Sequence, residues 1–220
     1  MFKNTNTSQI KDLHGIYNRT FPNKQDGFFV EVGAYDGWRW SNSVTLINEG
    51  WSGVLIEPVP QYFNSCKDRY QDNNKIKVHD CCIGWENKDK QKVYLGGPCT
   101  TTLPSMVELY QKTDPEDGHN LDRYIESQMY TLDTFLENNN VEKNFEVLGI
   151  DVEGAEWDIL KVFPIDKWKP KMAIIETMET HPHPETQASG NFKEVNEYFT
   201  DNGYTHIYGD VVNSIWILGD

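Results

Sequence analysis

Short apolar, β-branched runs alternate with segments of helical spacing along this chain, and this alternation constrains the fold more than any other feature. A parallel strand that is buried on both faces reads as an apolar run, and a helix usually crosses back over the sheet after it. The pattern therefore predicts a three-layer, Rossmann-like α/β domain with a mostly parallel sheet. The five runs are Gly27–Gly33, Gly53–Pro58, Lys75–Ile83, Phe145–Val152 and Lys171–Thr177.

The helical segments are bounded by recognisable start and stop residues. After the first run, Ser41 is a candidate N-cap and Gly50 a candidate C-cap. A second helix is expected to open at Pro60, since proline is favoured in a first helical turn. The helix that follows the fourth run should stop at Pro164.

Two further helices and a hairpin complete the pattern. Leu132, Phe135 and Leu136 recur at helical spacing just before the fourth run. Near the C-terminus a helix over residues 192–203 precedes two apolar segments around Gly209–Asp210. These two segments predict a C-terminal antiparallel hairpin.

The chain length and one irregular region define the expected domain organisation. A chain of 220 residues suits one sizeable core, so residues 1–220 are predicted to form a single domain with an N-terminal helical extension over residues 1–26. Residues 86–128 break the alternation because they are polar and rich in turn formers. Such a long irregular stretch is usually functional, so we expect an inserted loop or flap that covers a bound substrate.

Charge and cysteine usage exclude several classes of partner. The formal net charge is −14, with 20 basic and 34 acidic residues and no basic stripe, so binding to nucleic acid is not expected. No apolar run approaches the length of a membrane span, and the N-terminus does not read as a signal peptide. Four cysteines without metal-ligand spacing favour reduced thiols in the cytoplasm. The oligomeric state stays open.

The turn after the first run, Glu31–Gly37, lies where parallel sheets bind ligands, at the carboxyl end of a strand. Gly33 allows a close backbone approach or a positive φ. The pattern E-V-G-A-Y-D-G is neither a Walker loop nor a dinucleotide fingerprint. Asp36 would repel a pyrophosphate, whereas it suits a ligand that bears an amine or a sulfonium.

Glu57 ends the second run, where an acid can accept hydrogen bonds from both hydroxyls of a ribose. A nucleoside with a cationic tail in place of phosphates is S-adenosylmethionine. The two acidic strand ends therefore predict S-adenosylmethionine as the cofactor.

The sequence resembles the FkbM-type S-adenosylmethionine-dependent methyltransferases from about Gly27 to Glu176. The motifs that carry the resemblance are "FFVEVGAYDG", "GVLIEPVPQYF", "CCIG", "YTLDTFLE" and "VLGIDVEGAEWDILK". The resemblance implies a class I methyltransferase with a seven-stranded sheet that transfers methyl groups to hydroxyls, often on sugars or secondary metabolites.

The resemblance also implies positions for the cofactor. Glu31, Gly33 and Asp36 would surround its methionine moiety, with Ser41 and Asn42 nearby. Glu57 would bind the ribose, and Asp151 would lie beside the reactive methyl. Asp80, Cys81 and Cys82 would lie by the adenine, where the two cysteines favour packing over polar chemistry. Ala34, Tyr35 and Pro58 complete the predicted set of cofactor-binding residues.

Transfer to a hydroxyl requires a group that removes its proton. Asp151 ends an apolar strand, where an unpaired carboxylate is costly without a function, and Glu153 follows it closely. His181 is a third candidate, because histidine ordinarily titrates near neutral pH. For Glu156 and Asp158 we favour a helix-dipole role. The predicted catalytic residues are therefore Asp151, Glu153 and His181.

A divalent metal is a less favoured alternative. Catechol-type methyltransferases hold Mg²⁺ with acids at the ends of the fourth and fifth strands, which are the positions of Asp151 and Glu176 here. The rest of the sequence does not resemble that group.

The leading acceptor is a hydroxyl of a carbohydrate or another small molecule. Aromatic residues near the cofactor turn and in later loops could stack on sugar faces, or fill the core instead. They are Trp38, Trp40, Trp85, Tyr94 and Trp157. Two alternatives are a methyltransferase that acts on nitrogen or on a macromolecule, and a non-catalytic cofactor-binding module of a larger glycan-building protein.

Overall fold

The computed structural model describes residues 7–113 and 122–219. Its strands are β1 (Phe28–Val32), β2 (Ser52–Ile56), β3 (Ile76–His79), β4 (Cys82–Gly84), β5 (Lys88–Tyr94), β6 (Tyr124–Thr131), β7 (Val147–Ile150), β8 (Met172–Glu176), β9 (Tyr204–Gly209) and β10 (Asn213–Leu218). Its helices are α1 (Leu13–Thr20), α2 (Val44–Asn48), α3 (Pro60–Tyr70), η1 (Gly97–Cys99), α4 (Pro104–Thr113), α5 (Leu132–Asn138), α6 (Glu156–Leu160), α7 (Ile165–Trp168), α8 (Pro184–Ser189) and α9 (Phe192–Asp201).

The main sheet has seven strands in the order β3-β2-β1-β7-β8-β10-β9. Strands β3, β2, β1, β7 and β8 are parallel, and β10 runs antiparallel to both β8 and β9. The structure thus confirms the predicted parallel sheet with an antiparallel finish. The chain builds outward from β1 to β3 and then returns to place β7 on the other side of β1. This reversal creates a crevice at the carboxyl ends of β1 and β7.

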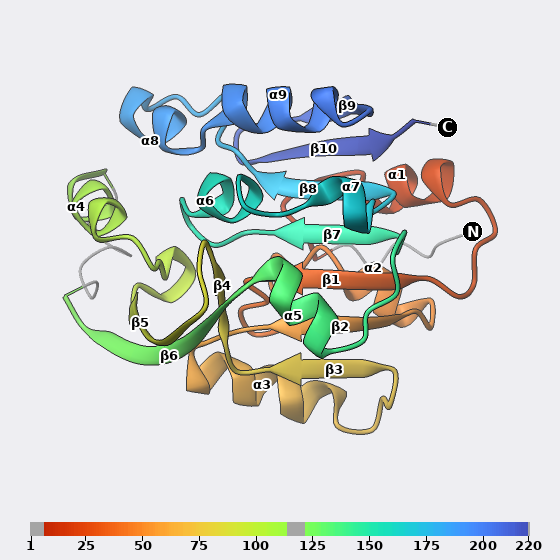
Figure 1. The fold of residues 1–220 in the computed structure, drawn as a ribbon, viewed down its shortest axis with the longest axis horizontal. Coiled ribbons are helices and arrows are strands. Elements are labelled where there is room, and N and C mark those ends of the chain that lie inside the picture. The colour runs from red at the N-terminus through yellow and green to blue at the C-terminus, as the bar shows by residue number, and fades with distance from the viewer. Residues whose placement is uncertain (1–6, 114–121, 220) are drawn as a thin grey trace.

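The sheet is covered on both faces, as the apolar runs predict. Successive side chains of β1 point to opposite faces, so that Val30 and Val32 join one buried cluster and Phe29 joins the other. The first cluster includes residues of α5, α6, α7 and α9, and the second includes residues of α1, α2 and α3. Figure 1 shows the two sets of helices in front of and behind the sheet.

The predicted strand over Lys75–Ile83 is wrong in one respect, because the chain divides it at Asp80. Strand β3 ends at His79 at the edge of the main sheet, whereas β4 belongs to a second sheet of order β4-β6-β5. Cys82 then packs with Val59, Val93 and Met129 in a separate apolar cluster. An edge strand lacks a neighbour that would hold its continuation in the sheet, and the apolar run cannot reveal this.

The segment over residues 86–128 is more ordered than the predicted loop or flap. Its described residues contain β5, η1, α4 and the start of β6. Strand β6 leaves most of its side chains partly or fully exposed, and α4 buries only Met106 and Tyr110. This weak burial explains why the apolar pattern missed these elements. The small sheet and α4 lie beyond the carboxyl ends of the parallel strands (Figure 1).

The helix after β1 begins later than predicted. Ser43 occupies the N-cap position of α2, and Ser41 lies outside the helix. Gly50 follows the C-terminal end with φ +84°, as expected for a residue that ends a helix.

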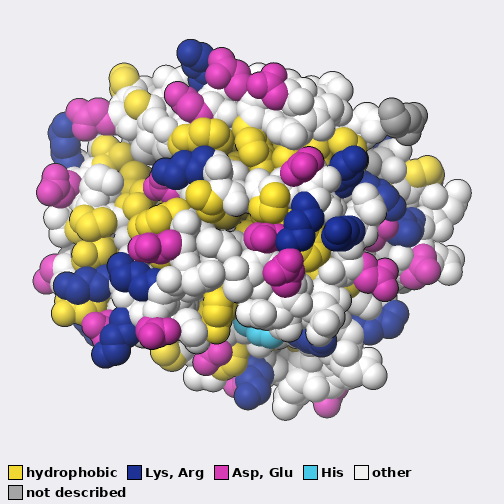
Figure 2. Space-filling model, viewed as in Figure 1, with side chains coloured by type: hydrophobic (Ala, Val, Ile, Leu, Met, Phe, Trp, Pro, Cys, Tyr) yellow, Lys and Arg dark blue, Asp and Glu magenta, His cyan; other side chains and the backbone are white. Residues whose placement is uncertain are grey.

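The outer surface shows no helix suited to a membrane and no basic stripe on the face that is drawn. Among the described residues, no helix is both long and apolar enough to cross a bilayer. Figure 2 shows Lys and Arg side chains interspersed with Asp and Glu side chains on one face.

Candidate active site

A cavity of about 400 Å³ opens at the carboxyl ends of the central strands. The strand register explains why acids meet there. Val32 is paired with Ile56 of β2 and Ile150 of β7, and Ile150 is paired with Ile175 of β8. The next residue of each strand therefore lies at one level of the sheet. These residues are Gly33, Glu57, Asp151 and Glu176, and all four line the cavity.

Gly33 adopts φ +84°, a conformation that side chains disfavour. A Cβ atom at this position would lie 1.7 Å from the carbonyl oxygen of Asp151. The amides of Gly33 and Ala34 both donate to the carbonyl of Ile56 at 3.0 Å. The absence of a side chain at residue 33 thus lets the ends of β1 and β7 approach closely, and Ala34 and Tyr35 also line the cavity.

Glu31 is a buried acid that fixes the segment after the turn. Its carboxylate accepts hydrogen bonds from the amide of Asn42 at 2.7 Å, the hydroxyl of Ser41 at 3.0 Å and the hydroxyl of Ser43. Burial raises the pKa of Glu31, and these donors act against that rise. The Ser41 hydroxyl therefore donates to Glu31 and does not cap the N-terminus of a helix. Glu31, Ser41 and Asn42 all line the cavity.

The N-terminal segment braces the same loop from outside. The hydroxyl of Tyr17 donates to the carbonyl of Asn42 at 2.7 Å, and Ser8 donates to the Asn42 side chain at 2.6 Å. Gln9 lines the cavity. The helical extension predicted for residues 1–26 thus contributes α1 and contacts to the candidate cofactor site, while residues 1–6 lie outside the described residues.

Glu57 is held with its carboxylate in the cavity. One of its oxygens accepts from the Tyr35 amide at 2.9 Å and the other from the Val59 amide at 2.8 Å. Burial raises the pKa of Glu57 to about 8, although both amide donors oppose the rise. Pro58 and Tyr62 line the same region, and the ring of Tyr62 lies 4.3 Å from that of Tyr35.

Two predicted cofactor residues are not among the residues that line the cavity. The carboxylate of Asp36 accepts from the amides of Trp38 and Arg39 and from Arg39 Nε at 2.8 Å. Partial burial works to raise the pKa of Asp36, but the bonds from Arg39 and Trp38 outweigh it and lower the pKa. Asp80 is exposed where the chain leaves β3. The structure therefore brings neither carboxylate to the cavity.

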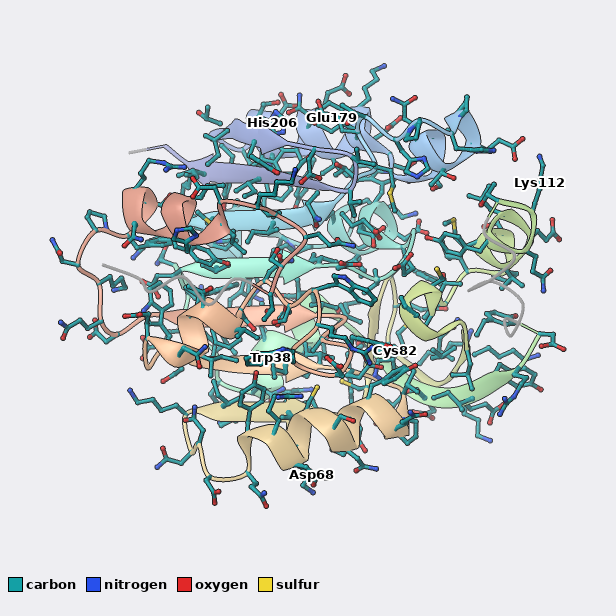
Figure 3. The ribbon with its side chains drawn as sticks, turned by 180° about the vertical axis from the view of Figure 1, so that it is seen from behind. Trp38, Asp68, Cys82, Lys112, Glu179 and His206 are labelled. Carbon is teal, nitrogen blue, oxygen red and sulfur yellow. The ribbon has the colours of Figure 1, made fainter. Side chains whose placement is uncertain are left out.

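Cys81 and Cys82 do line the cavity, and both are buried. Burial raises the pKa of each thiol to about 12, so both remain protonated at neutral pH. Cys82 is labelled in Figure 3. Their position agrees with packing roles beside a ligand.

Three carboxyl groups meet where β7 and β8 end. Oxygen atoms of Asp151, Glu153 and Glu176 lie within 4.8 Å of one another. Burial raises the pKa of Asp151 to about 6, and a hydrogen bond with Glu176 opposes this rise. Burial, followed by the charge of Asp151, raises the pKa of Glu176 well above its ordinary value. Glu176 therefore favours its neutral form and can donate a hydrogen bond to Asp151.

The acids of the following turn have structural roles. Glu156 accepts hydrogen bonds from the amides of Val152 at 2.7 Å and Gly154 at 3.0 Å, so it fixes the turn around Glu153. Burial raises its pKa to about 7. Besides the expected interaction with the helix dipole, Glu156 therefore holds the preceding turn by hydrogen bonds. Asp158 pairs with Lys161 outside the cavity.

The three carboxyl groups of Asp151, Glu153 and Glu176 are also the described residues that could hold a metal ion. Carboxylate oxygens suit Mg²⁺ or Ca²⁺. Asp151 and Glu176 were the predicted pair, and Glu153 adds a third oxygen ligand.

The remaining predicted residues divide between the cavity and other places. His181 lines the cavity, and its Nδ1 accepts from the amide of His183 at 3.1 Å. Of the aromatic residues considered for a sugar, Trp40 lines the cavity and is 42% exposed. The other four are not among the lining residues; they are Trp38, Trp85, Tyr94 and Trp157.

Sequence reasoning named none of the individual residues by which the inserted segment forms a wall of the cavity. This wall comprises Gly97–Thr102, Tyr110 and Thr113. The long polar region was the only available signal, and no motif singles out Tyr110. Another part of the lining comes from the segment after β8, through Met178, His181, His183 and Thr186.

The strand order and the cavity at the reversal beside β1 are those of the Rossmann-like fold of class I methyltransferases. The model of the methyltransferase FkbM domain matches residues 31–205, so this chain belongs to the FkbM methyltransferase family. The family implies S-adenosylmethionine as the methyl donor. A search among curated proteins gives no match.

Solved structures share the fold at low sequence identity. An O-methyltransferase from Bacillus cereus in complex with SAH is 10% identical, with a TM-score of 0.50 over 94% of this chain and 79% of that chain. The precorrin-6y C5,15-methyltransferase from Geobacter metallireducens GS-15 is 11% identical, with a TM-score of 0.48 over 100% of this chain and 94% of that chain.

Proposed function

We propose that this protein transfers a methyl group from S-adenosylmethionine to a hydroxyl group of a carbohydrate or another small molecule. The observation that carries the proposal is the meeting of ligand-binding and proton-accepting carboxyl groups in one cavity. Glu57 lies at the end of β2, while Asp151 and Glu153 follow β7.

The cofactor would extend from β2 towards β7. The Glu57 carboxyl would hydrogen-bond the ribose hydroxyls, with Cys81 and Cys82 beside the adenine. Gly33 leaves room for the methionine moiety next to the loop that Glu31 fixes. Asp151, whose pKa of about 6 leaves it ionised at neutral pH, would attract a sulfonium and repel a pyrophosphate.

The bound cofactor supplies a methyl group on a positively charged sulfur, which is already a good leaving group. The chain must align the acceptor oxygen with that methyl and take up the hydroxyl proton. Asp151 and Glu153 are the proposed carboxylates for this step, Asp151 to orient the acceptor hydroxyl and Glu153 to take up its proton, because both line the cavity. His181 also lines the cavity and would contact the acceptor.

The charges around the cavity support an uncharged acceptor over an anionic one. Among the described residues that line it, Arg39 is the sole lysine or arginine, and its Nε already pairs with Asp36. A phosphate or carboxylate on the acceptor would therefore meet the acids without a free cation to neutralise it. Hydroxyls on the lining threonines and on Tyr110 suit the hydrogen bonding of a sugar.

A labelled-methyl assay tests the proposal. S-adenosylmethionine labelled in its methyl group would be incubated with neutral glycosides, phosphorylated sugars and amines, and the product bond would be identified by mass spectrometry. We expect label on a hydroxyl of a neutral acceptor. Label found only on nitrogen, or no transfer at all by protein that binds S-adenosylhomocysteine, would refute the proposal.

Two matched variants assign the reaction to the cavity. Asp151→Asn should reduce transfer by about 100-fold, because Asp151 is proposed to orient the acceptor hydroxyl beside the methyl group and a misplaced acceptor can cost this much. Asp158→Asn makes the same chemical change outside the cavity, at a residue paired with Lys161, and should retain wild-type turnover. Equal effects of the two substitutions would contradict the role of Asp151.

A further inference from the structure

The turn after β7 holds Glu153 in a backbone conformation that it would not adopt alone. Glu153 has φ +61°, and the next residue, Gly154, has φ +103°. A side chain in the left-handed region costs about 1–3 kcal/mol and persists where its surroundings hold it. Glu156 supplies part of that support by accepting from the amides on both sides of Glu153, those of Val152 and Gly154.

The inserted segment supplies further support. The hydroxyl of Thr101 donates to the Glu153 carbonyl at 2.9 Å, and the hydroxyl of Tyr110 donates to the Glu153 carboxylate. Met106 packs against Gly154 so closely that a Cβ there would lie 2.7 Å from its side chain. The segment from η1 to α4 thus contacts the backbone and the side chain of this turn.

Tyr110 is well suited to a lasting hydrogen bond. It is buried, so its hydrogen bond to Glu153 is shielded from water. Helix α4, from which it projects, is also tied to α8 by two hydrogen bonds from Lys112 to Glu185 at 2.6 and 2.7 Å. Lys112 is labelled on α4 in Figure 3.

The position of Glu153 is fixed differently from those of its acidic neighbours Asp151 and Glu176. Asp151 follows the last residue of β7 and Glu176 is the last residue of β8, so the sheet places both. Glu153 lies in a turn, and its side chain can rotate unless a partner restrains it. Tyr110 is such a partner, and it lines the same cavity.

We propose that Tyr110 is a positioning residue that aims the Glu153 carboxylate at the acceptor hydroxyl, so that the inserted segment completes the active site. The inference rests on the proposed function. In the reaction, the acceptor oxygen forms a bond to the methyl carbon as the carbon–sulfur bond breaks. The bonding pair stays on sulfur, and the hydroxyl proton passes to Glu153. S-adenosylhomocysteine and a methyl ether are released, and Glu153 then returns the proton to water.

A double-mutant cycle tests this role with Tyr110→Phe, Glu153→Gln and the double variant. Tyr110→Phe retains the ring and removes only the hydroxyl. It should lower kcat about 10-fold and leave both the KM for S-adenosylmethionine and the affinity for S-adenosylhomocysteine within about 2-fold, because a misplaced catalytic group affects turnover before cofactor binding. Glu153→Gln should lower kcat about 100-fold.

The decisive measurement is the coupling between the two substitutions. If Tyr110 acts through Glu153, the double variant should have a kcat within about 2-fold of Glu153→Gln alone. Multiplied losses, or an unchanged kcat in Tyr110→Phe, would overturn the proposal. Glu153→Asp gives a second cycle if the glutamine variant turns over too slowly to measure.

A matched control separates positioning from stability. Tyr198 also donates its hydroxyl to the chain, at 2.6 Å to the Phe163 carbonyl, and it is not among the lining residues. Tyr198→Phe should lower the thermal midpoint without coupling to Glu153→Gln. The cycle uses whichever acceptor the wild type methylates, so methyl transfer to nitrogen would refute only the proposed acceptor. A wild type that binds S-adenosylhomocysteine but methylates nothing would remove the role of Tyr110 as well.

Discussion

The energetic effect of the close approach between β1 and β7 can be measured by comparing alanine substitutions at two glycines that share one backbone angle. Gly33 and Gly50 both have φ +84°. A Cβ at residue 50 would meet only the flexible end of Lys75, at 3.9 Å, whereas a Cβ at residue 33 would lie 1.7 Å from the carbonyl oxygen of Asp151. Alanine at residue 50 therefore adds backbone strain alone, and alanine at residue 33 adds the same strain and a collision.

The magnitudes follow from these contacts. Backbone strain at φ +84° should cost Gly50→Ala about 1–2 kcal/mol of unfolding free energy. Gly33→Ala must also separate two backbones by about 1.3 Å to reach even a 3.0 Å contact. That movement stretches the hydrogen bonds from the Asp151 amide to Val32 and from the Gly33 amide to Ile56. At about 1 kcal/mol for each of these two bonds, added to the backbone strain, the total is about 3–4 kcal/mol.

Thermal unfolding and calorimetry with S-adenosylhomocysteine provide the assays. At about 2–4 °C per kcal/mol, Gly50→Ala should lower the midpoint by roughly 2–8 °C and Gly33→Ala by roughly 6–16 °C. Gly33→Ala should also weaken S-adenosylhomocysteine binding about 100-fold, because it displaces the site by about 1 Å. Gly50 precedes β2 at the opposite edge of the sheet, so Gly50→Ala should bind normally. Equal midpoints and equal affinities for the two variants would refute the reasoning.

Three other outcomes are expected. Because the pKa of Glu57 is raised to about 8 from an ordinary 4.5, the folded state holds an extra proton between these values. Between pH 4.5 and 9, the free energy of unfolding measured in urea should fall by up to roughly 4–5 kcal/mol more in the wild type than in Glu57→Gln. Parallel pH profiles of the unfolding free energy would contradict this. Ser43→Ala removes a donor to the buried Glu31 carboxylate and should lower the unfolding free energy by about 1–3 kcal/mol; an unchanged urea midpoint would contradict it. Excess chelator should leave methyl transfer intact if the carboxyl groups act without metal, and activity restored only by Mg²⁺ would show the opposite.

Local patterns were sufficient for most of the main sheet. The apolar runs, the helical spacing around Leu132 and the stop at Pro164 each depend on neighbouring residues, and the structure confirms the elements that they predicted. The carboxyl ends of parallel strands share one edge, so the sequence alone predicts that Glu57 and Asp151 lie near each other. The role of Gly33 could also be predicted, because only glycine tolerates such a close approach to the Asp151 carbonyl.

Other features of the site depended on contacts between distant residues. Asp36 pairs with Arg39, and Ser41 donates to Glu31, although both had been expected to serve other roles. The division at Asp80 required the second sheet, whose strand β6 comes from a distant part of the chain.

The sequence by itself determined the parallel sheet and the acids at its carboxyl edge, because side-chain period and turn chemistry act over a few residues. Only the tertiary structure decided which of those acids face the cavity and which partner holds each one. Tyr110 reaches Glu153 across 43 residues of chain. Such a contact arises from packing, and no local pattern records it.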